Sequence, residues 1–228
     1  MDFLSVLNQK KPALIMSLPG NDPSLARIAV ECGADVIKIH MNVQHRASGI
    51  HFGSFEEEKE RLAEIREIAG QLPCGIVAGS CFEDVERDFL YPAQMGYEFI
   101  SLYASATPLS VLADKNMKKM IALAPGYSLE EVRLLGAIGA DVLEASVMRP
   151  ETYGQRLTAK ELLEYAAITE NSKLPVVIPT QRAILPCEVS QLSQIGVSGI
   201  MIGAVVTRKE METIKKSVSA FRNAIDRL

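Results

Sequence analysis

A short element that begins with glycine recurs four times and constrains the fold more than any other feature of the chain. Each copy is a glycine, two further residues and an apolar run, and a segment with a helical pattern precedes it. The copies lie at 33–37, 96–100, 139–143 and 196–200. Glycine suits the end of a helix, where a left-handed residue closes the last turn, and the apolar run suits a buried parallel strand. Each copy therefore predicts a helix that leads into a strand.

Four other apolar runs alternate with these copies, so that a strand and a helix follow one another eight times. These runs lie at 13–18, 74–79, 120–124 and 176–179. Eight parallel strands with eight helices close as a (β/α)8 TIM barrel of the α/β class, with any active site at the carboxyl ends of the strands. An open doubly wound sheet normally has fewer strands and a glycine-rich loop after the first one, where this chain has Pro19-Gly20-Asn21-Asp22-Pro23. We expect one barrel domain over residues 1–228.

Composition limits the kinds of partner that the chain can have. A net charge of -4 and a pI of about 5.5 argue against a nucleic-acid surface. No apolar run approaches the roughly 18 residues that cross a bilayer, and the first residues lack the pattern of a secretion signal. The four cysteines show neither metal nor disulfide spacing, which favours a reducing, cytoplasmic location. Apolar outer helices would permit a homodimer.

Alignment of the four glycine elements predicts which side chains face the mouth of the barrel. Because side chains alternate along a strand, Lys38 and Glu144 occupy equivalent positions. Two residues further on, His40, Tyr103 and Ser146 are equivalent. The second and sixth strands of an eight-stranded ring are opposite each other. We therefore expect Lys38 and Glu144 to point inward from facing walls.

Buried lysine and glutamate are costly unless they are paired or used. We interpret Lys38 and Glu144 as a catalytic pair that His40 assists. Lys38 would act as a base, a Schiff-base nucleophile or an anion clamp, and Glu144 as a general acid or base. The alternative is an internal ion pair that only orders the barrel core.

All three histidines fall in one stretch at and after the second predicted strand, where we expect a long polar loop. His40 is assigned to the site, whereas the roles of His45 and His51 stay open. The histidine spacing matches no standard set of metal ligands, and we expect no metal and no cofactor.

A second long loop, 147–156, follows the sixth predicted strand and is expected to face the first loop across the mouth. Its Arg149, Tyr153 and Arg156 would hold an anionic or sugar-like ligand, or else lie on the surface. With Tyr103, Ser146 and Thr180, Arg149 completes the predicted substrate pocket.

The last quarter of the chain has the features of a phosphate site. The seventh predicted strand ends in Thr180-Gln181-Arg182, and the eighth runs from Gly199 to Ala204. In TIM barrels the loops after these strands often bind phosphate through backbone N–H groups. We predict a phosphate site at Arg182, Gly203 and Ala204; the alternative is that the small residues merely end a tightly packed strand.

These motifs resemble those of the ribulose-phosphate-binding barrel superfamily, and within it of the N-acetylmannosamine-6-phosphate 2-epimerases. The resemblance is best over 139–208, where Met201-Ile202-Gly203-Ala204-Val205-Val206-Thr207 matches the family's eighth strand, and it extends to 33–38. It implies a phosphate site at Arg182, Gly203 and Ala204, with Lys38 and His40 lining the pocket. The chain departs from the family at Ala78, Thr180 and Tyr103, which stand where the family has lysine, glutamate and aspartate. The resemblance therefore implies a shared scaffold and phosphate grip, without the epimerase's own proton-transfer groups.

We expect an enzyme that acts on a small phosphorylated sugar-like metabolite by isomerase- or epimerase-type proton transfer next to a carbonyl. One alternative is an aldolase-type lyase that uses Lys38 as a Schiff base. Another is a barrel without catalysis that binds or senses a phosphorylated ligand. Neither nucleic acid nor a membrane is an expected partner.

Overall fold

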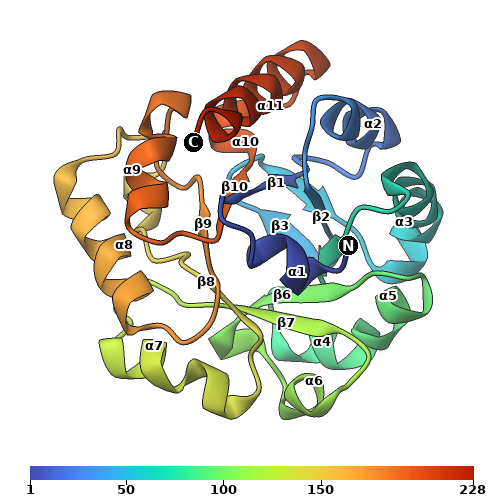
Figure 1. Ribbon diagram of the computed structural model, residues 1–228. Coiled ribbons are helices and arrows are strands. Elements are labelled where there is room, and N and C mark those ends of the chain that lie inside the picture. Colours follow the sequence, from blue (N-terminus) through green and yellow to red (C-terminus); the bar gives the residue numbers. More distant parts are fainter.

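Eight parallel strands form a closed ring in the computed structural model, which describes residues 1–228 (Figure 1). The barrel strands are β1 (Ala13–Ser17), β2 (Val36–His40), β5 (Cys74–Val77), β6 (Phe99–Tyr103), β7 (Lys118–Ala122), β8 (Val142–Glu144), β9 (Val176–Pro179) and β10 (Gly199–Ile202). Each strand pairs in parallel with its neighbours in this order, and β1 pairs with β10 to close the ring. The predicted (β/α)8 TIM barrel is confirmed.

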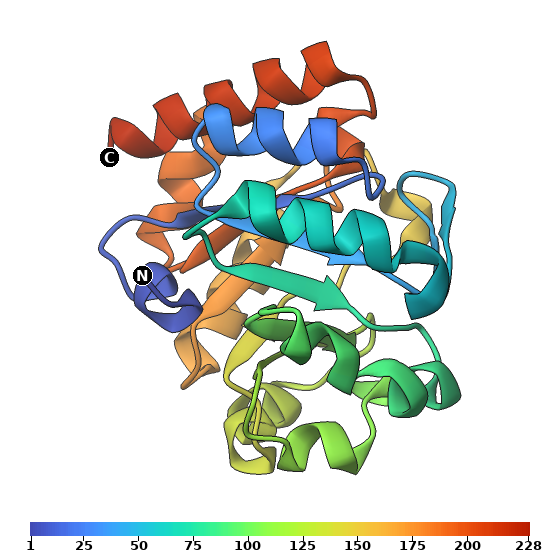
Figure 2. The same ribbon diagram turned by 90° about the vertical axis from the view of Figure 1, so that its right-hand side faces the viewer.

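Helices follow the strands and surround the barrel (Figures 1 and 2). They are α2 (Pro23–Glu31), α3 (Phe55–Ala69), α4 (Phe82–Asp88), α5 (Leu90–Gln94), α6 (Leu109–Ala113), α7 (Leu129–Leu134), α8 (Ala159–Asn171), α9 (Val189–Gln194), α10 (Ala204–Thr207) and α11 (Met211–Asp226). Short 3-10 segments lie at Ala104–Ala106, Leu135–Ile138, Pro150–Thr152 and Pro186–Glu188. No helix is both long and apolar enough to cross a membrane.

The four repeated glycines end helical segments as predicted. Gly33, Gly96, Gly139 and Gly196 all have positive φ angles, between 82° and 102°. A residue with a side chain rarely adopts this left-handed conformation, so glycine is the residue that can turn the chain from helix to strand here. In every copy the next barrel strand begins three residues after the glycine.

The long polar segment that we expected after β2 folds as a β-hairpin. Its strands β3 (Val43–His45) and β4 (Ile50–Phe52) pair antiparallel, and Val43 lies opposite Phe52. Both of these side chains are buried, and Gly49 turns the chain with a φ of 69°. The polar residues between them hide this short alternation in the sequence. Figure 2 shows the hairpin, in light blue, at the end of the barrel away from the N-terminus.

The opposite end of the barrel is closed by the N-terminal helix α1 (Phe3–Leu7), which lies across the ring (Figure 1). Its Phe3 and Leu7 pack on inward-facing residues of the strands, and the Phe3 and Phe99 rings stack with centroids 3.8 Å apart. The Phe99 ring fills the space beside Gly75, where a Cβ atom would lie only 2.1 Å from it. This end of the barrel is therefore solidly packed.

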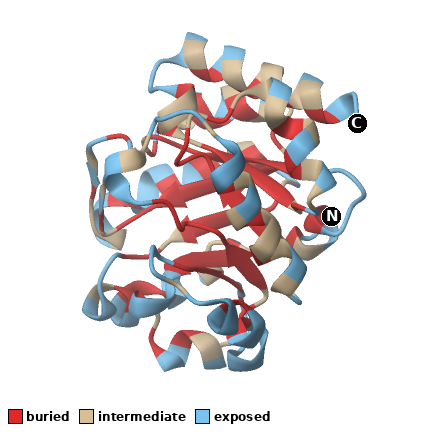
Figure 3. Cartoon of the chain, turned by 90° about the vertical axis from the view of Figure 1, so that its left-hand side faces the viewer, coloured by how far each residue is buried: buried red, intermediate tan, exposed pale blue.

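A second and larger apolar core lies between the strands and the surrounding helices. It contains 46 buried residues, among them Leu14, Ile37 and Ile200, which alternate with the inward-facing positions of their strands. Figure 3 shows the barrel strands buried and the exposed residues concentrated on the outer faces of the helices and in the loops. Because both strand faces are buried, most of the strands are continuous apolar runs at their amino-terminal ends; β7, which begins with Lys118 and Lys119, is the exception.

Candidate active site

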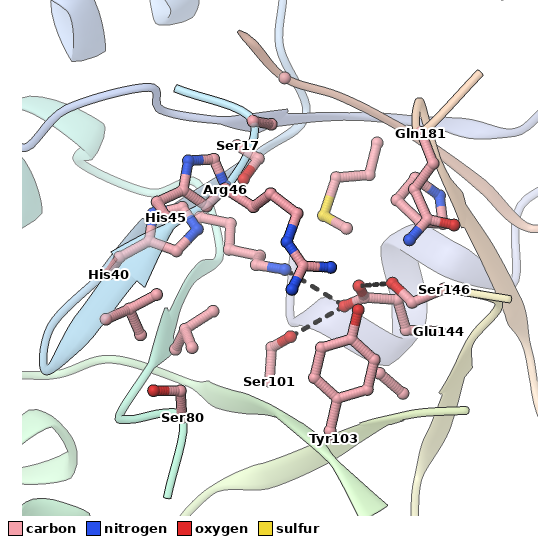
Figure 4. Close-up of a pocket in the computed structure, with 18 of the residues that line it drawn as sticks. Ser17, His40, His45, Arg46, Ser80, Ser101, Tyr103, Glu144, Ser146 and Gln181 are labelled. Carbon is pink, nitrogen blue, oxygen red and sulfur yellow. Dashed lines mark hydrogen bonds and ion pairs between the residues drawn. The ribbon is translucent and has the colours of Figure 1, made fainter. Parts of the chain in front are cut away.

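A pocket of about 470 Å³ opens at the carboxyl ends of the barrel strands (Figure 4). Residues from most of the barrel strands and from the segments that follow them line it, with the β3–β4 hairpin on one side and the segment after β8 on another. Eight of the ten side chains predicted for the site line the pocket; these are Lys38, His40, Tyr103, Glu144, Ser146, Thr180, Gly203 and Ala204. Arg149 and Arg182 do not.

Lys38 and Glu144 meet in the centre of the barrel, as their positions on opposite strands predict. Lys38 Nζ lies 3.1 Å from Glu144 Oε2, and each residue is 5% exposed. The same carboxylate oxygen accepts a hydrogen bond from Ser101 Oγ at 2.8 Å, and Oε1 accepts one from Ser146 Oγ at 2.7 Å. Figure 4 shows the hydroxyl groups of Ser101 and Ser146 directed at the carboxylate. The site thus holds a buried ion pair with further polar support.

The electrostatics of the pair keep Glu144 ionised. Burial by itself would raise the pKa of this carboxyl group, because it disfavours the charged form. The charge of Lys38 and the hydrogen bonds from Ser146, Ser101 and Lys38 outweigh burial, so the pKa of Glu144 is lowered. The lowered pKa favours the carboxylate form of Glu144.

His40 is neutral and lies under the hairpin. Burial lowers the pKa of His40 well below its ordinary value, and the nearby His45 and Lys38 lower it further. The His40 ring packs against the rings of His45 and Phe52, with centroids 4.5 and 4.8 Å away. Its Nδ1 atom is buried and has no hydrogen-bond partner. A polar atom left in this state is costly to bury, which marks His40 as a candidate for ligand contact.

The other two histidines lie on opposite faces of the hairpin. His45 lines the pocket, and burial together with the charge of Lys38 lowers the pKa of His45 to about 4. Its Nδ1 atom lies 2.7 Å from Ser48 Oγ. His51 is exposed and does not line the pocket. No group of three or more His, Cys, Asp or Glu side chains lies close enough together to hold a metal ion.

Polar groups from three further segments complete the walls. Burial is the main cause that raises the pKa of Tyr103, so its phenol stays protonated at neutral pH. Gln181 Nε2 donates a hydrogen bond to the Tyr153 hydroxyl at 2.6 Å. Thr180 Oγ1 accepts one from the backbone N–H of Gly203 at 3.1 Å and so ties the end of β9 to the end of β10. Tyr153 belongs to the loop that we expected to contact a ligand, whereas Gln181 was not among our predicted site residues.

Arg182 does not lie in the pocket, although the sequence pattern predicts it there. It is buried behind the end of β9, where its guanidinium pairs with Glu161 of α8 and donates to Gln155 Oε1 at 2.9 Å. Its charge is therefore already matched within the protein. Arg149 is exposed and lies outside the pocket as well. The chain turns sharply after each of these strands, and strand alternation does not predict side-chain direction beyond the turn.

Arg46, which the sequence reasoning missed, is the arginine that lines the pocket. It lies in the turn of the hairpin, and Figure 4 shows its guanidinium extending over the pocket toward Glu144 and Tyr103. Alternation within 43–52 is the signal that would have revealed the hairpin and, with it, the position of Arg46.

Ala78, which we matched to a lysine of the resembling family, does not occupy a pocket position. It is fully buried in the core between the barrel and the helices. The pocket positions at the end of β5 are Val77 and Gly79, and neither can ionise. This part of the wall therefore contributes no acid or base.

Comparison with known proteins extends the description of the fold. The sequence matches no family model and no curated protein. A thiamine phosphate pyrophosphorylase from Pyrococcus furiosus superposes with a TM-score of 0.65 at 18% identity, over 96% of each chain. A tryptophan synthase from Mycobacterium tuberculosis gives 0.73 at 13% identity, over 97% of this chain and 96% of that one. A variant of the tryptophan synthase α-subunit from Pyrococcus furiosus gives 0.70 at 15% identity, over 93% and 98%. These likenesses support the TIM-barrel fold.

Proposed function

We propose that the chain is an enzyme that transfers a proton next to a carbonyl group of a small phosphorylated sugar-like metabolite, as isomerases and epimerases do. The observation that carries this proposal is the buried ion pair between Lys38 and Glu144 at the carboxyl end of the barrel. Active sites of TIM-barrel enzymes are built at this end. The pocket above the pair, at about 470 Å³, falls within the usual size range for a small-molecule site.

The pair can supply both functions that such a reaction needs. The Lys38 ammonium stabilises the negative charge that develops on the carbonyl oxygen as the neighbouring carbon loses its proton. Glu144 accepts the proton and returns it. When Lys38 turns from Glu144 toward a substrate oxygen, a main cause of the lowered pKa of Glu144 is weakened, so the carboxylate becomes a stronger base. Neutral Tyr103 remains a hydrogen-bond donor at the edge of the site.

The backbone at Gly203 is the observation that favours a phosphate group on the substrate. Gly203 has φ -149° and ψ -167°, an extended conformation that any residue adopts. A Cβ atom there would lie 3.6 Å from Ser17, which is ordinary contact. Since neither the backbone nor the packing requires glycine, close approach of a ligand to the main chain is the explanation that we favour. One structural neighbour, thiamine phosphate pyrophosphorylase, is also named after a phosphorylated compound.

Proton transfer is favoured over the aldolase-type alternative by the same ion pair. A lysine must be a neutral amine to attack a carbonyl and form a Schiff base. In this structure Lys38 Nζ instead donates a hydrogen bond to Glu144 Oε2 at 3.1 Å, which engages the nitrogen that the attack would need. The binding or sensing alternative has its own support. At the ends of β5 and β9, where the resembling family has a lysine and a glutamate, the pocket residues are Val77, Gly79 and Thr180.

Deuterium exchange tests the proposal. Phosphorylated trioses, pentoses and hexoses, first selected by the rise that they cause in melting temperature, are incubated with the protein in D2O. We expect deuterium next to the carbonyl of at least one compound, detected by NMR, and a loss of about a thousandfold or more in exchange rate for Lys38→Met and Glu144→Gln.

Lys119→Met is the matched control, because Lys119 forms an ion pair with Asp141 at 3.4 Å but lies outside the pocket. Its exchange rate should equal that of the wild type. Stabilisation by phosphorylated sugars without any exchange would contradict the enzyme proposal and support the binding or sensing alternative.

A further inference from the structure

The charges that line the pocket do not balance. Its ionised side chains at neutral pH are Lys38, Glu144 and Arg46, because the pKa values of His40 and His45 are both lowered by burial. Lys38 and Glu144 neutralise each other at 3.1 Å. One positive charge, that of Arg46, is left without a protein counter-charge.

Arg46 differs in this respect from the paired arginines around the mouth. The guanidinium of Arg182 pairs with Glu161, and that of Arg156 pairs with Glu188. Arg46 takes part in none of the salt bridges or side-chain hydrogen bonds of the chain, although it lines the pocket. In the view of Figure 4 its guanidinium extends toward Glu144 and Tyr103. All five of its N–H donors are therefore available to a ligand.

Both strands of the hairpin that carries Arg46 pack on the His40 ring. From β3, His45 packs against it in the pocket wall, with ring centroids 4.5 Å apart. From β4, Phe52 is only 1% exposed and contacts the same His40 ring. The turn is closed by the Gly49 N–H, which donates to the His45 carbonyl at 2.8 Å. Arg46 is thus an exposed turn residue that directly follows the packed strand β3.

The guanidinium also acts across the pocket. Its positive charge reaches Tyr153, in the segment after β8, where it opposes the burial that raises the pKa of that phenol. A ligand in the site would therefore lie between the Lys38–Glu144 pair below and a cationic group above. A planar guanidinium binds phosphate and carboxylate oxygens with two parallel hydrogen bonds.

We propose that Arg46 is the residue that selects an anionic ligand, by binding its phosphate or carboxylate oxygens from the hairpin side of the pocket. Arg46 takes the role that the sequence pattern assigns to Arg182. The inference rests on the proposed function only in placing a small anionic metabolite in this pocket, and it does not depend on which reaction follows.

Binding of inorganic phosphate and of acetate to the whole chain tests the inference, with dissociation constants measured by calorimetry at low ionic strength. We expect at least one of the two anions to bind in the millimolar range or tighter. Arg46→Ala should weaken that binding at least tenfold, and Arg46→Lys should give an intermediate value, because lysine keeps the charge without the planar fork. The two anions distinguish a phosphate site from a carboxylate site.

Arg27→Ala is the matched control, since Arg27 is an exposed arginine of α2 outside the pocket and without an ion pair. It removes the same charge and should bind like the wild type. Hydrogen exchange gives a second readout: the bound anion should slow exchange in 43–52 of the wild type but not of Arg46→Ala.

Equal binding by Arg46→Ala and Arg27→Ala would overturn the inference. The absence of binding by the wild type at 50 mM of either anion would overturn it too; a dissociation constant of 50 mM corresponds to a binding free energy of roughly 2 kcal/mol. Anion binding lost in Arg46→Ala, with no deuterium exchange on any sugar phosphate, would uphold the role of Arg46 and reject the proposed reaction. Deuterium exchange on a sugar phosphate, together with unchanged anion binding in Arg46→Ala, would reject the role of Arg46 and uphold the proposed reaction.

Discussion

The two ends of the barrel are built from the same strands and differ in what their inward-facing side chains do. Near the amino ends these positions form a lower row of Ile15, Val36, Phe99, Met120, Val142, Val177 and Met201. Two residues further along the chain they form an upper row of Ser17, Lys38, Ser101, Ala122, Glu144, Pro179 and Gly203. One end is an apolar plug that α1 covers, and the other is a pocket that holds the Lys38–Glu144 ion pair. A shift of two residues along a strand therefore separates the part that stabilises the fold from the part available for chemistry.

The difference is also one of free energy. Each large apolar side chain in the lower row contributes about 1.5–3 kcal/mol by leaving water. In the upper row, Lys38 and Glu144 lose their hydration, and their attraction at 3.1 Å must offset that cost. A chain selected only for stability has little reason to keep such a pair. On the proposed function, the lower row provides stability and the upper row binds the ligand.

The largest expected effect comes from opening the apolar plug. Phe99→Ala removes the ring that stacks on Phe3 and fills the space beside Gly75. We expect a loss of about 4 kcal/mol in the free energy of unfolding, measured in urea, because the cavity cannot fully collapse. Folded Phe99→Ala protein should still bind phosphate, since the ring does not line the pocket. A loss of binding in the folded variant would break the separation of the two rows.

Removing one partner of the ion pair should have the next largest effect. Lys38→Met leaves the Glu144 carboxylate buried, 5% exposed, without its counter-charge. We expect about 3 kcal/mol of destabilisation at pH 7 by urea unfolding. The loss should shrink in acid, where Glu144 of the variant takes up a proton. A loss that did not depend on pH would show that packing, and not charge, is what Lys38 provides.

Acid should lower the free energy of unfolding through His45, on the hairpin side of the pocket, by less than the loss expected for Lys38→Met. The pKa of His45 is lowered from 6.5 to about 4, so between these values the unfolded chain binds a proton that the folded chain does not. Stability is therefore complete above pH 6.5 and falls as the pH drops toward 4, by about 1.4 kcal/mol per pH unit for this histidine. Between pH 7 and pH 5, His45→Gln should lose about 2 kcal/mol less than the wild type. His51→Gln, on the exposed face of β4, should behave like the wild type.

The smallest effect on stability is expected at Gly203, and it sharpens the comparison between the two ends. Gly203→Ala adds a Cβ atom 3.6 Å from Ser17 and should change the free energy of unfolding by less than about 0.5 kcal/mol. Gly75→Ala places the same atom 2.1 Å from the Phe99 ring and should destabilise by about 1–3 kcal/mol. If a ligand approaches the main chain at Gly203, only Gly203→Ala should weaken the stabilisation of the protein by sugar phosphates, as thermal shift would measure. Equal ligand stabilisation in both variants would contradict the phosphate site.

Much of this architecture could be predicted from the sequence because it is written in short, periodic patterns. The glycines at helix ends gave the strand order, and alternation along two of those strands placed Lys38 and Glu144 face to face. The patterns fail where the chain leaves regular structure. Arg182 turns away to pair with Glu161, and Arg46 reaches the pocket only because the polar stretch after β2 folds as a hairpin. These positions depend on tertiary contacts that no local spacing encodes.

The central claim is that the Lys38–Glu144 pair of the upper row serves a ligand and not the fold. The double variant Lys38→Met/Glu144→Leu tests this claim most directly. Its free energy of unfolding is measured in urea at pH 7, beside deuterium exchange on a sugar phosphate that the wild type turns over. We predict a stability equal to that of the wild type or higher by about 1–4 kcal/mol, because apolar residues of similar size replace a buried ion pair, together with complete loss of exchange. A double variant that loses about 3 kcal/mol or more, like Lys38→Met alone, would contradict the claim and show that the pair orders the barrel.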